Sequence, residues 1–210
     1  MDGGTYLKLV NFGDEFCIND SAPKMIAKIL EYEYDDMSSV LMTNEKLFRD
    51  VVTYTVKNDV DDCIFLIGWT TPYRRDNEFA GEYFVYSPEN KDYPSNRFNT
   101  LHKYDHYLFD NVLINNTWVG LVYGLQQYLE SLNIKYYMYN TQEKIEFNEH
   151  TGTILRNLNN KQYHNPLNLE STMLHYLKKQ GHNDIGYHAH KEWAQFILQK
   201  FRAIGLINRK

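Results

Sequence analysis

The stretch Asp62-Cys63-Ile64-Phe65-Leu66-Ile67-Gly68 decides the fold class of this chain. Its apolar residues run without a break, whereas a strand with one face in water alternates polar and apolar side chains. An uninterrupted apolar strand is expected where helices cover both faces of a sheet, which is typical of parallel sheets. The stretch therefore predicts a buried central strand.

Strands and helices alternate on both sides of this stretch. Short apolar runs predict three further strands, at Tyr6–Phe12, Ser38–Met42 and Ile134–Asn140. Capping residues and apolar residues at helical spacing predict helices at Ser21–Tyr32, Glu45–Lys57, Leu101–Leu132, Leu169–Lys179 and Gly186–Ile204. The third helix is expected to break near Asn115-Asn116, and residues 141–168 give no clear prediction.

This alternation predicts an α/β fold, a three-layer αβα sandwich with a parallel central sheet. We expect residues 1–210 to form a single domain. An aromatic-rich insertion or lid is expected around residues 69–110, with a hairpin near Glu82–Tyr86. In such sheets the ligand crevice lies beyond the carboxyl ends of the strands, so the loops that follow the strands are the places to seek a site.

Composition and charge disfavour several classes of protein. The chain has 22 Lys and Arg against 27 Asp and Glu, and the net charge of -5 opposes binding to nucleic acid. No apolar stretch approaches the roughly 20 residues that cross a membrane, and Met1-Asp2-Gly3-Gly4 does not resemble a signal peptide. Cys17 and Cys63 form neither a disulfide scaffold nor a zinc motif, and no cofactor is expected. The 18 Tyr, 11 Phe and 3 Trp leave contact with sugars or protein partners open.

Four segments fall on or near the expected loops: Val10–Cys17 (VNFGDEFC), Thr43–Arg49 (TNEKLFR), Ile67–Arg75 (IGWTTPYRR) and Gly181–Ala194 (GHNDIGYHAHKEWA). In this order they resemble the sequence blocks of the SGNH/GDSL hydrolase family, especially its compact members encoded by tailed phages. The first is similar to the family's Gly-Asp-Ser block, and the fourth to the block with the catalytic His. The resemblance implies the SGNH-hydrolase topology, which is flavodoxin-like, and a relationship to ester hydrolases.

The positions that carry catalysis in that family depart from its pattern here. The nucleophilic serine should follow Asp14, but that position holds Glu15. The glycine and asparagine of the family's oxyanion hole should fall near Leu41 and at Thr70, where only the Thr70 hydroxyl remains as a donor. Acyl transfer by a serine hydrolase depends on an attacking hydroxyl, a base and these donors together.

His182 matches the family's catalytic imidazole, yet the acidic partner expected three residues earlier is Lys179. Loss of the nucleophile lowers turnover by about 10⁶-fold. The carboxylate of Glu15 is favourable at a helix N-terminus and can pair with a protonated His182. We therefore interpret His182, Glu15, Asp14 and Thr70 as vestigial catalytic positions in a site that keeps its shape and has lost its chemistry.

Two other chemistries are less favoured. As an acid–base pair on a glycosidic bond, Asp14 and Glu15 would need carboxyl groups about 5–9.5 Å apart on either side of the substrate, whereas neighbouring side chains at a strand end diverge. The fourth segment also holds residue types that bind metals, namely His182, Asp184, His188 and His190. Because residues two apart on a helix point about 200° away from each other, His188 and His190 do not easily face one ion. No metal site is therefore expected.

Binding is expected on the loop after the central strand. The candidate side chains are Trp69, Thr71, Tyr73, Arg74 and Arg75, with Asn44 from the second segment. Aromatic faces beside guanidinium groups suit a sugar ring, an acidic glycan or a protein partner. The alternative is a loop that Trp69 anchors in the core, with two solvated arginines.

These observations favour a catalytically degenerate SGNH-hydrolase-like protein that acts as a binding or structural component. The resemblance to phage-type members implies a virion-associated protein whose partner is another protein of the assembly or a glycan; without a signal peptide, the other expected location is the cytoplasm. The alternative is an active carbohydrate esterase or deacetylase with an atypical site, with or without a metal near His182. A structural interaction protein with no ligand pocket is a third possibility.

Overall fold

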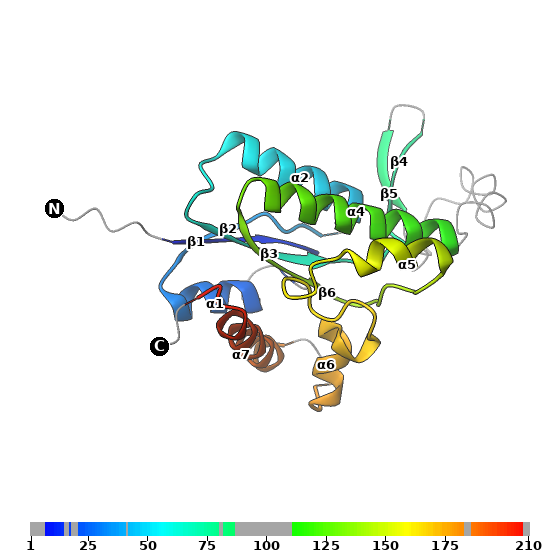
Figure 1. The fold of residues 1–210 in the computed structure, drawn as a ribbon. Coiled ribbons are helices and arrows are strands. Elements are labelled where there is room, and N and C mark those ends of the chain that lie inside the picture. The colour runs from blue at the N-terminus through cyan, green and yellow to red at the C-terminus, as the bar shows by residue number, and fades with distance from the viewer. Residues whose placement is uncertain are drawn as a thin grey trace.

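A parallel sheet of four strands lies at the centre of the protein, in the order β2-β1-β3-β6 (Figure 1). The computed structural model describes residues 7–14, 17, 21–40, 42–79, 82–86, 111–182 and 186–207. The strands of the sheet are β1 (Lys8–Phe12), β2 (Glu33–Asp36), β3 (Cys63–Trp69) and β6 (Lys135–Asn140). Every residue of β3 is buried, as its uninterrupted apolar sequence predicts for a central strand.

Helices cover both faces of this sheet (Figure 1). On one face lie α1 (Ala22–Leu30), α6 (Met173–Lys179) and α7 (Tyr187–Ala203), and on the other α2 (Asn44–Lys57), α4 (Asn111–Ser131) and α5 (Glu149–Arg156). Each face has its own apolar core, and successive residues of β3 alternate between the two. Phe65 packs with the α2 and α4 side, and Leu66 packs with the α1 and α7 side. The predicted three-layer α/β architecture is confirmed.

A single parallel bridge extends the sheet beyond β6, where Met138 pairs with Tyr163. Met138 N donates to Gln162 O at 2.7 Å, and His164 N donates to Met138 O at 2.8 Å. Residues 162–164 therefore occupy the place of a fifth strand without forming a longer one. The segment covers one edge of the sheet, and β2 forms the opposite edge.

The prediction of a strand at Ser38–Met42 is wrong. The second strand is Glu33–Asp36, and residues 38–40 are not in a strand. Among the described strands β2 pairs with β1 alone and forms the sheet edge, so its side chains are exposed or half-buried and carboxylates are tolerated there. Lys8 of β1 lies 3.2 Å from Asp35 of β2 and offsets part of that negative charge. A strand of this composition gives no apolar signal in the sequence.

The expected break near Asn115-Asn116 is also wrong, because α4 runs through both residues. The side chain of Asn115 forms a reciprocal pair with the backbone of Glu146: Nδ2 donates to Glu146 O, and Oδ1 accepts from Glu146 N at 2.9 Å. This tertiary contact offsets the weak helix propensity of asparagine. Residues 101–110 of the predicted helix lie outside the described residues. No described helix, α4 included, combines the length and the apolar character needed to cross a membrane.

Two helix boundaries depend on caps. Asn148 begins α5 in the segment that gave no prediction: its Oδ1 accepts from Thr151 N at 2.9 Å, and Thr151 Oγ1 accepts from Asn148 N at 2.9 Å. The helix predicted over Leu169–Lys179 is divided into a short 3₁₀ turn (η2, Leu169–Ser171) and α6. Thr172 between them caps α6, which explains the division.

The predicted hairpin is confirmed, since β4 (Arg75–Phe79) pairs antiparallel with β5 (Glu82–Tyr86). It follows directly on the loop after β3, and Figure 1 shows the hairpin projecting away from the sandwich. The hairpin therefore begins at the same edge of the sheet as the expected ligand crevice.

Candidate functional site

Polar side chains collect where three strands end. The register of β1 with β3, and of β3 with β6, brings the carboxyl ends of these strands to one edge of the sheet. Buried polar residues follow each strand there: Asp14 after β1, Thr70 and Thr71 after β3, and Thr141 after β6. This is the edge at which open α/β sheets hold their ligands.

The carboxylate of Asp14 is fully buried at this edge. Its Oδ2 accepts a hydrogen bond from Thr141 Oγ1 at 3.0 Å and lies 4.0 Å from Nη1 of Arg74. Arg74 is only 4% exposed, and its Nη1 also donates to Thr70 Oγ1 at 3.3 Å. A charge taken out of water needs an opposite charge and hydrogen bonds, and Arg74 and Thr141 supply them. We call Asp14, Thr70, Arg74 and Thr141 the Asp14 cluster.

The start of α2 is fixed to the same edge through Asn44. Thr43 caps α2, its Oγ1 accepting from Lys46 N at 3.1 Å. Asn44 Nδ2 donates to Thr70 O at 3.3 Å, and Thr70 N donates to Asn44 Oδ1 at 3.1 Å. An oxyanion hole needs N–H groups aimed at an open position. The N–H of Thr70 is instead bonded inside the protein.

Cys17 is a buried thiol in the apolar core on the α1 and α7 side of the sheet. Its Sγ lies 3.3 Å from Tyr139 Oη, and both side chains are at most 1% exposed. Burial, with a contribution from the Asp14 charge, raises the pKa of Cys17 well above its ordinary value, so the reactive thiolate is disfavoured. A Cβ on Gly13 would overlap Cys17 Sγ, and one on Gly68 would lie 3.0 Å from Tyr139 Oη. These two glycines allow the close approach.

An imidazole supported by a carboxylate lies between α6 and α7. His182 Nε2 is 2.7 Å from Oε2 of Glu192 on α7, and the two side chains are 22% and 34% exposed. In a Ser-His-Asp triad the acid bonds Nδ1 and leaves Nε2 for the nucleophile. Here the carboxylate holds Nε2. Among the described residues, no hydroxyl or thiol is hydrogen-bonded to His182.

The sequence did not predict Glu192 as the acidic partner of His182. The position three residues before His182, where the family's acid is expected, holds Lys179, which pairs with Glu170 at 3.1 Å. Glu192 lies ten residues after His182 and more than one turn into the next helix. The packing of α7 against α6 accompanies this contact, and no local sequence spacing predicts it.

The predicted binding residues do not form one surface. Trp69 is fully buried in the core shared with α2 and α4. Thr71 and Asn44 are each 3% exposed, so they contact the protein interior, and Arg74 belongs to the Asp14 cluster. Tyr73 is only half-buried and lines a cavity beside the sheet edge.

The two histidines of α7, His188 and His190, do not share the contact that His182 makes with Glu192. His190 Nδ1 accepts from Ala22 N, at the start of α1, at 3.4 Å, and burial lowers the pKa of His190. His188 is exposed on α7. Within the described ranges, no group of three or more His, Cys, Asp or Glu side chains is arranged to hold a metal ion. Sequence-predicted positions outside the described residues are Glu15, Leu41, Asp184 and the side chain of Arg75.

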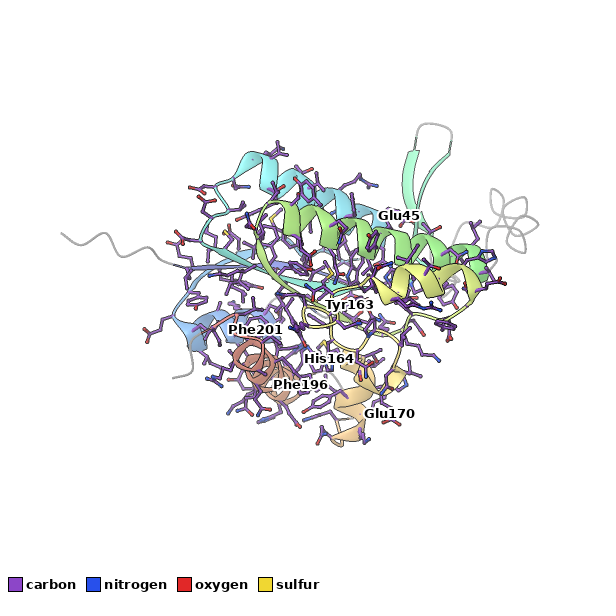
Figure 2. All side chains as sticks on the ribbon, in the orientation of Figure 1. Glu45, Tyr163, His164, Glu170, Phe196 and Phe201 are labelled. Atoms are coloured by element: carbon purple, nitrogen blue, oxygen red, sulfur yellow. The ribbon has the colours of Figure 1, made fainter. Side chains whose placement is uncertain are left out.

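Aromatic side chains fill the space between β6, α6 and α7, and Figure 2 shows His164 and Phe196 there. The rings of His164 and Phe196 have centroids 4.9 Å apart, and His164 lies 6.3 Å from Trp193. Lys200 Nζ is 5.1 Å from the centre of the Phe196 ring. Burial, followed by the charge of Lys200, lowers the pKa of His164 to about 4. The ring is therefore neutral at neutral pH.

Mild acid is expected to destabilise the protein through His164. Because the pKa of His164 in the folded state lies below the ordinary histidine value of 6.5, the unfolded chain takes up the proton first as the pH falls. The stabilisation that comes from the neutral His164 ring is complete above about pH 6.5 and is lost as the pH falls toward 4. Between about pH 7 and 5 the loss should be about 1–2 kcal/mol, reduced because the ring is partly exposed. Urea unfolding at both pH values measures it, and an equal loss in His164→Phe would contradict this origin.

A cavity of about 320 Å³ opens beside the sheet edge. Its walls come from the loop after β3, the first turns of α4 and the segment between β6 and α5. Besides Tyr73, the lining includes Glu143, Glu146 and Phe147, which the sequence reasoning missed. These residues belong to a segment without strand or helix periodicity, so no local pattern pointed to them.

Comparisons with known proteins identify the fold. No protein-family model matches this sequence, and neither does any curated protein. Among solved structures, a lipolytic protein of the G-D-S-L family from Desulfitobacterium hafniense is similar with a TM-score of 0.51 and 10% identity, over 92% of this chain and 98% of that one. An acetyl xylan esterase is similar with a TM-score of 0.48 and 14% identity, over 92% of this chain and 98% of that one. A carbohydrate esterase is similar with a TM-score of 0.47 and 11% identity, over 94% of this chain and 70% of that one. The first likeness shows the SGNH-hydrolase-like fold that the sequence blocks predict.

Proposed function

We propose that this chain, which has an SGNH-hydrolase-like fold, is a non-hydrolytic protein that acts as a binding or structural component. The observation that carries the proposal is Glu15, a glutamate where acyl transfer needs a serine, and the internal contacts of the Asp14 cluster support it. A hydrolase needs an open position at this edge for a substrate carbonyl, with a hydroxyl on one side and donors on the other. This chain has a glutamate instead of a serine at the nucleophile position, and the residue before it, Asp14, is a buried carboxylate bonded to Thr141 and paired with Arg74.

The remaining catalytic groups are engaged in contacts within the protein. The N–H of Thr70 donates to Asn44, and the Thr70 hydroxyl accepts from Arg74. The Nε2 atom of His182 is held by Glu192. The Thr70 N–H and the Nε2 atom of His182 would have to give up these partners before they could act on an ester, whereas the Thr70 hydroxyl keeps its own proton to donate. This arrangement supports a stable scaffold more than an acyl-transfer centre.

A binding role is supported by the cavity beside Tyr73, which is at the small end of the about 300–1,000 Å³ usual for ligand sites. The resemblance of the four sequence blocks to phage-type members supports a virion or another assembly as the setting. A protein of that assembly or a glycan is the partner that we propose.

The test of lost chemistry is an ester hydrolysis assay with p-nitrophenyl acetate and acetylated xylan. We expect wild-type protein and His182→Ala to hydrolyse both substrates at the same background rate, because no described nucleophile is bonded to this imidazole. Glu15→Ser should stay equally inactive, since a new hydroxyl would still lack free donors and a free Nε2. His150→Ala, which removes an exposed histidine on α5, controls for slow surface reaction. Turnover that disappears in His182→Ala and persists in His150→Ala would overturn the proposal.

One observation favours the alternative of an active carbohydrate esterase. The 2.7 Å contact of His182 with Glu192 gives an imidazole with a carboxylate partner, which a general base requires. An esterase of this kind would need Glu192 to orient His182. In that case Glu192→Gln would lower turnover together with His182→Ala, whereas the non-hydrolytic proposal expects neither substitution to matter.

A further inference from the structure

The cavity beside the sheet edge has a fixed frame. The reciprocal pair between Asn115 and the backbone of Glu146 joins α4 to one wall, with Glu146 N donating to Asn115 Oδ1 at 2.9 Å. Asn148 Nδ2 donates to Asn116 Oδ1 at 3.3 Å, and the Asn148 side chain also caps α5. Figure 1 shows α4 and α5 lying together above the sheet. The wall that carries residues 143–148 is therefore held in place.

Two aromatic side chains lie at this cavity without being buried by the core. Phe147 is 63% exposed, although a large apolar side chain is usually withdrawn from water. It lies against Gly152 of α5, where a Cβ would come within 3.0 Å of Phe147 Cζ. Tyr73, on the loop after β3, is half-buried and also lines the cavity. A ligand in the cavity would cover apolar surface that the fold leaves in water.

The charges at the cavity have a net negative sign. Glu143, Lys144 and Glu146 line it, and Lys144 lies 3.3 Å from Glu146. That pair leaves Glu143 as the carboxylate without an ion-pair partner among the described residues. Burial, followed by the charges of Glu143 and Glu146, raises the pKa of Tyr73, in line with the two carboxylates that line the cavity beside it. The potential inside the cavity therefore favours a cation.

We propose that this cavity binds an organic ammonium group, placed between Tyr73 and Phe147 and neutralised by Glu143. Aromatic faces attract cations through their quadrupole, and a carboxylate adds a full opposite charge. An anionic ligand would meet Glu143 and is excluded by repulsion. The inference goes beyond the proposed function, because ammonium binding holds whether or not the sheet edge hydrolyses esters.

The ammonium group can come from a small quaternary amine or from a lysine side chain of a partner. Both sources present an organic ammonium, the first with carbons around the charge and the second with an –NH3+ group at the end of an apolar stem, and an ammonium is the chemistry that the cavity recognises. Choline represents the first source. Nα-acetyl-lysine methylamide, which keeps a free ε-ammonium, represents the second. Of these two cations, the one that binds more tightly identifies the source. Saturable binding of either cation supports the site.

The experiment is a titration of the full chain with choline, followed through the backbone amide NMR signals of residues 143–148. We expect saturable shifts with a dissociation constant of about 1–10 mM, typical of one cation–π site with a partly solvated carboxylate. Dimethylbutanol, in which carbon replaces the nitrogen of choline, should bind at least about tenfold more weakly. Equal binding of this neutral analogue would overturn the proposal.

Two variants locate the site without disturbing the fold. Glu143→Gln removes the charge, and Phe147→Ala removes an exposed ring; each should weaken choline binding by about fivefold or more. Asp61→Asn is the matched control, because this exposed carboxylate precedes β3 and lies at the opposite end of the strand. Absence of saturable binding by both cations, or unchanged affinity in both cavity variants, would refute the ammonium site and leave the ester hydrolysis result untouched.

Discussion

Asp14→Ala is expected to lower the free energy of unfolding by about 3–5 kcal/mol. The substitution removes a fully buried carboxylate that accepts from Thr141 and faces Arg74. Arg74, only 4% exposed, then keeps its charge inside the protein without this carboxylate beside it. Removing one member of a buried pair is strongly destabilising for this reason, even where the intact pair adds little net stability. Urea unfolding at neutral pH measures the loss.

Two further variants separate charge from packing at this position. Asp14→Asn keeps the volume and an oxygen that can accept from Thr141, so its loss isolates the missing negative charge. Asp61→Ala removes an exposed carboxylate at the other end of β3 and should change stability by no more than about 0.5 kcal/mol. A loss below about 1 kcal/mol in Asp14→Ala would mean that the Asp14 cluster is not a structural element. The Asp14 cluster would then give no support to a non-hydrolytic role, which would rest on Glu15.

Trp193→Ala should also lower the free energy of unfolding by about 3–5 kcal/mol. The indole is 1% exposed and stacks on Phe196 with ring centroids 5.0 Å apart. It also lies 5.3 Å from Tyr176 of α6 and 5.5 Å from Tyr139 of β6, so one side chain joins two helices to the sheet. Truncation leaves a cavity that neighbouring rings cannot fill, because they are fixed by their own elements.

The matched control is Tyr187→Ala, which removes an aromatic ring from the first turn of the same helix. Tyr187 is 61% exposed, so its loss should change stability by about 0.5 kcal/mol or less. Thermal and urea unfolding of both variants give the comparison. Similar stability losses for Trp193→Ala and Tyr187→Ala would show that α7 is not anchored through the indole. Because Glu192 precedes Trp193, we also expect the His182–Glu192 contact to loosen in Trp193→Ala.

The elements with strong periodicity were predictable, and the elements decided by their surroundings were not. The central strand at 63–69 and the helices at 44–57 and 187–203 appear close to their expected bounds, because apolar residues mark their buried faces. β2 was misplaced because an edge strand needs little apolar surface. The break expected at Asn115 does not occur, because its side chain bonds to Glu146 from a distant segment.

The candidate site follows the same division. The positions of Asp14 and Thr70 at strand ends came from the order of strands and loops, which the sequence displays. The pairing of Asp14 with Arg74, and of His182 with Glu192, depends on side chains brought together by turns and helix packing. Trp69 illustrates the limit, because an aromatic residue at a strand end suits a binding loop and a core equally well until its burial is known.

By itself the sequence determined that helices must cover both faces of a parallel sheet, since the apolar run at 63–67 cannot face water. It also determined which residue types stand at the strand ends, including a glutamate where a serine would be needed for acyl transfer. The tertiary structure alone decided which charges neutralise each other and where a cavity remains. Hydrogen bonds and ion pairs depend on distances of a few ångströms between remote segments, and no local pattern in a sequence encodes those distances.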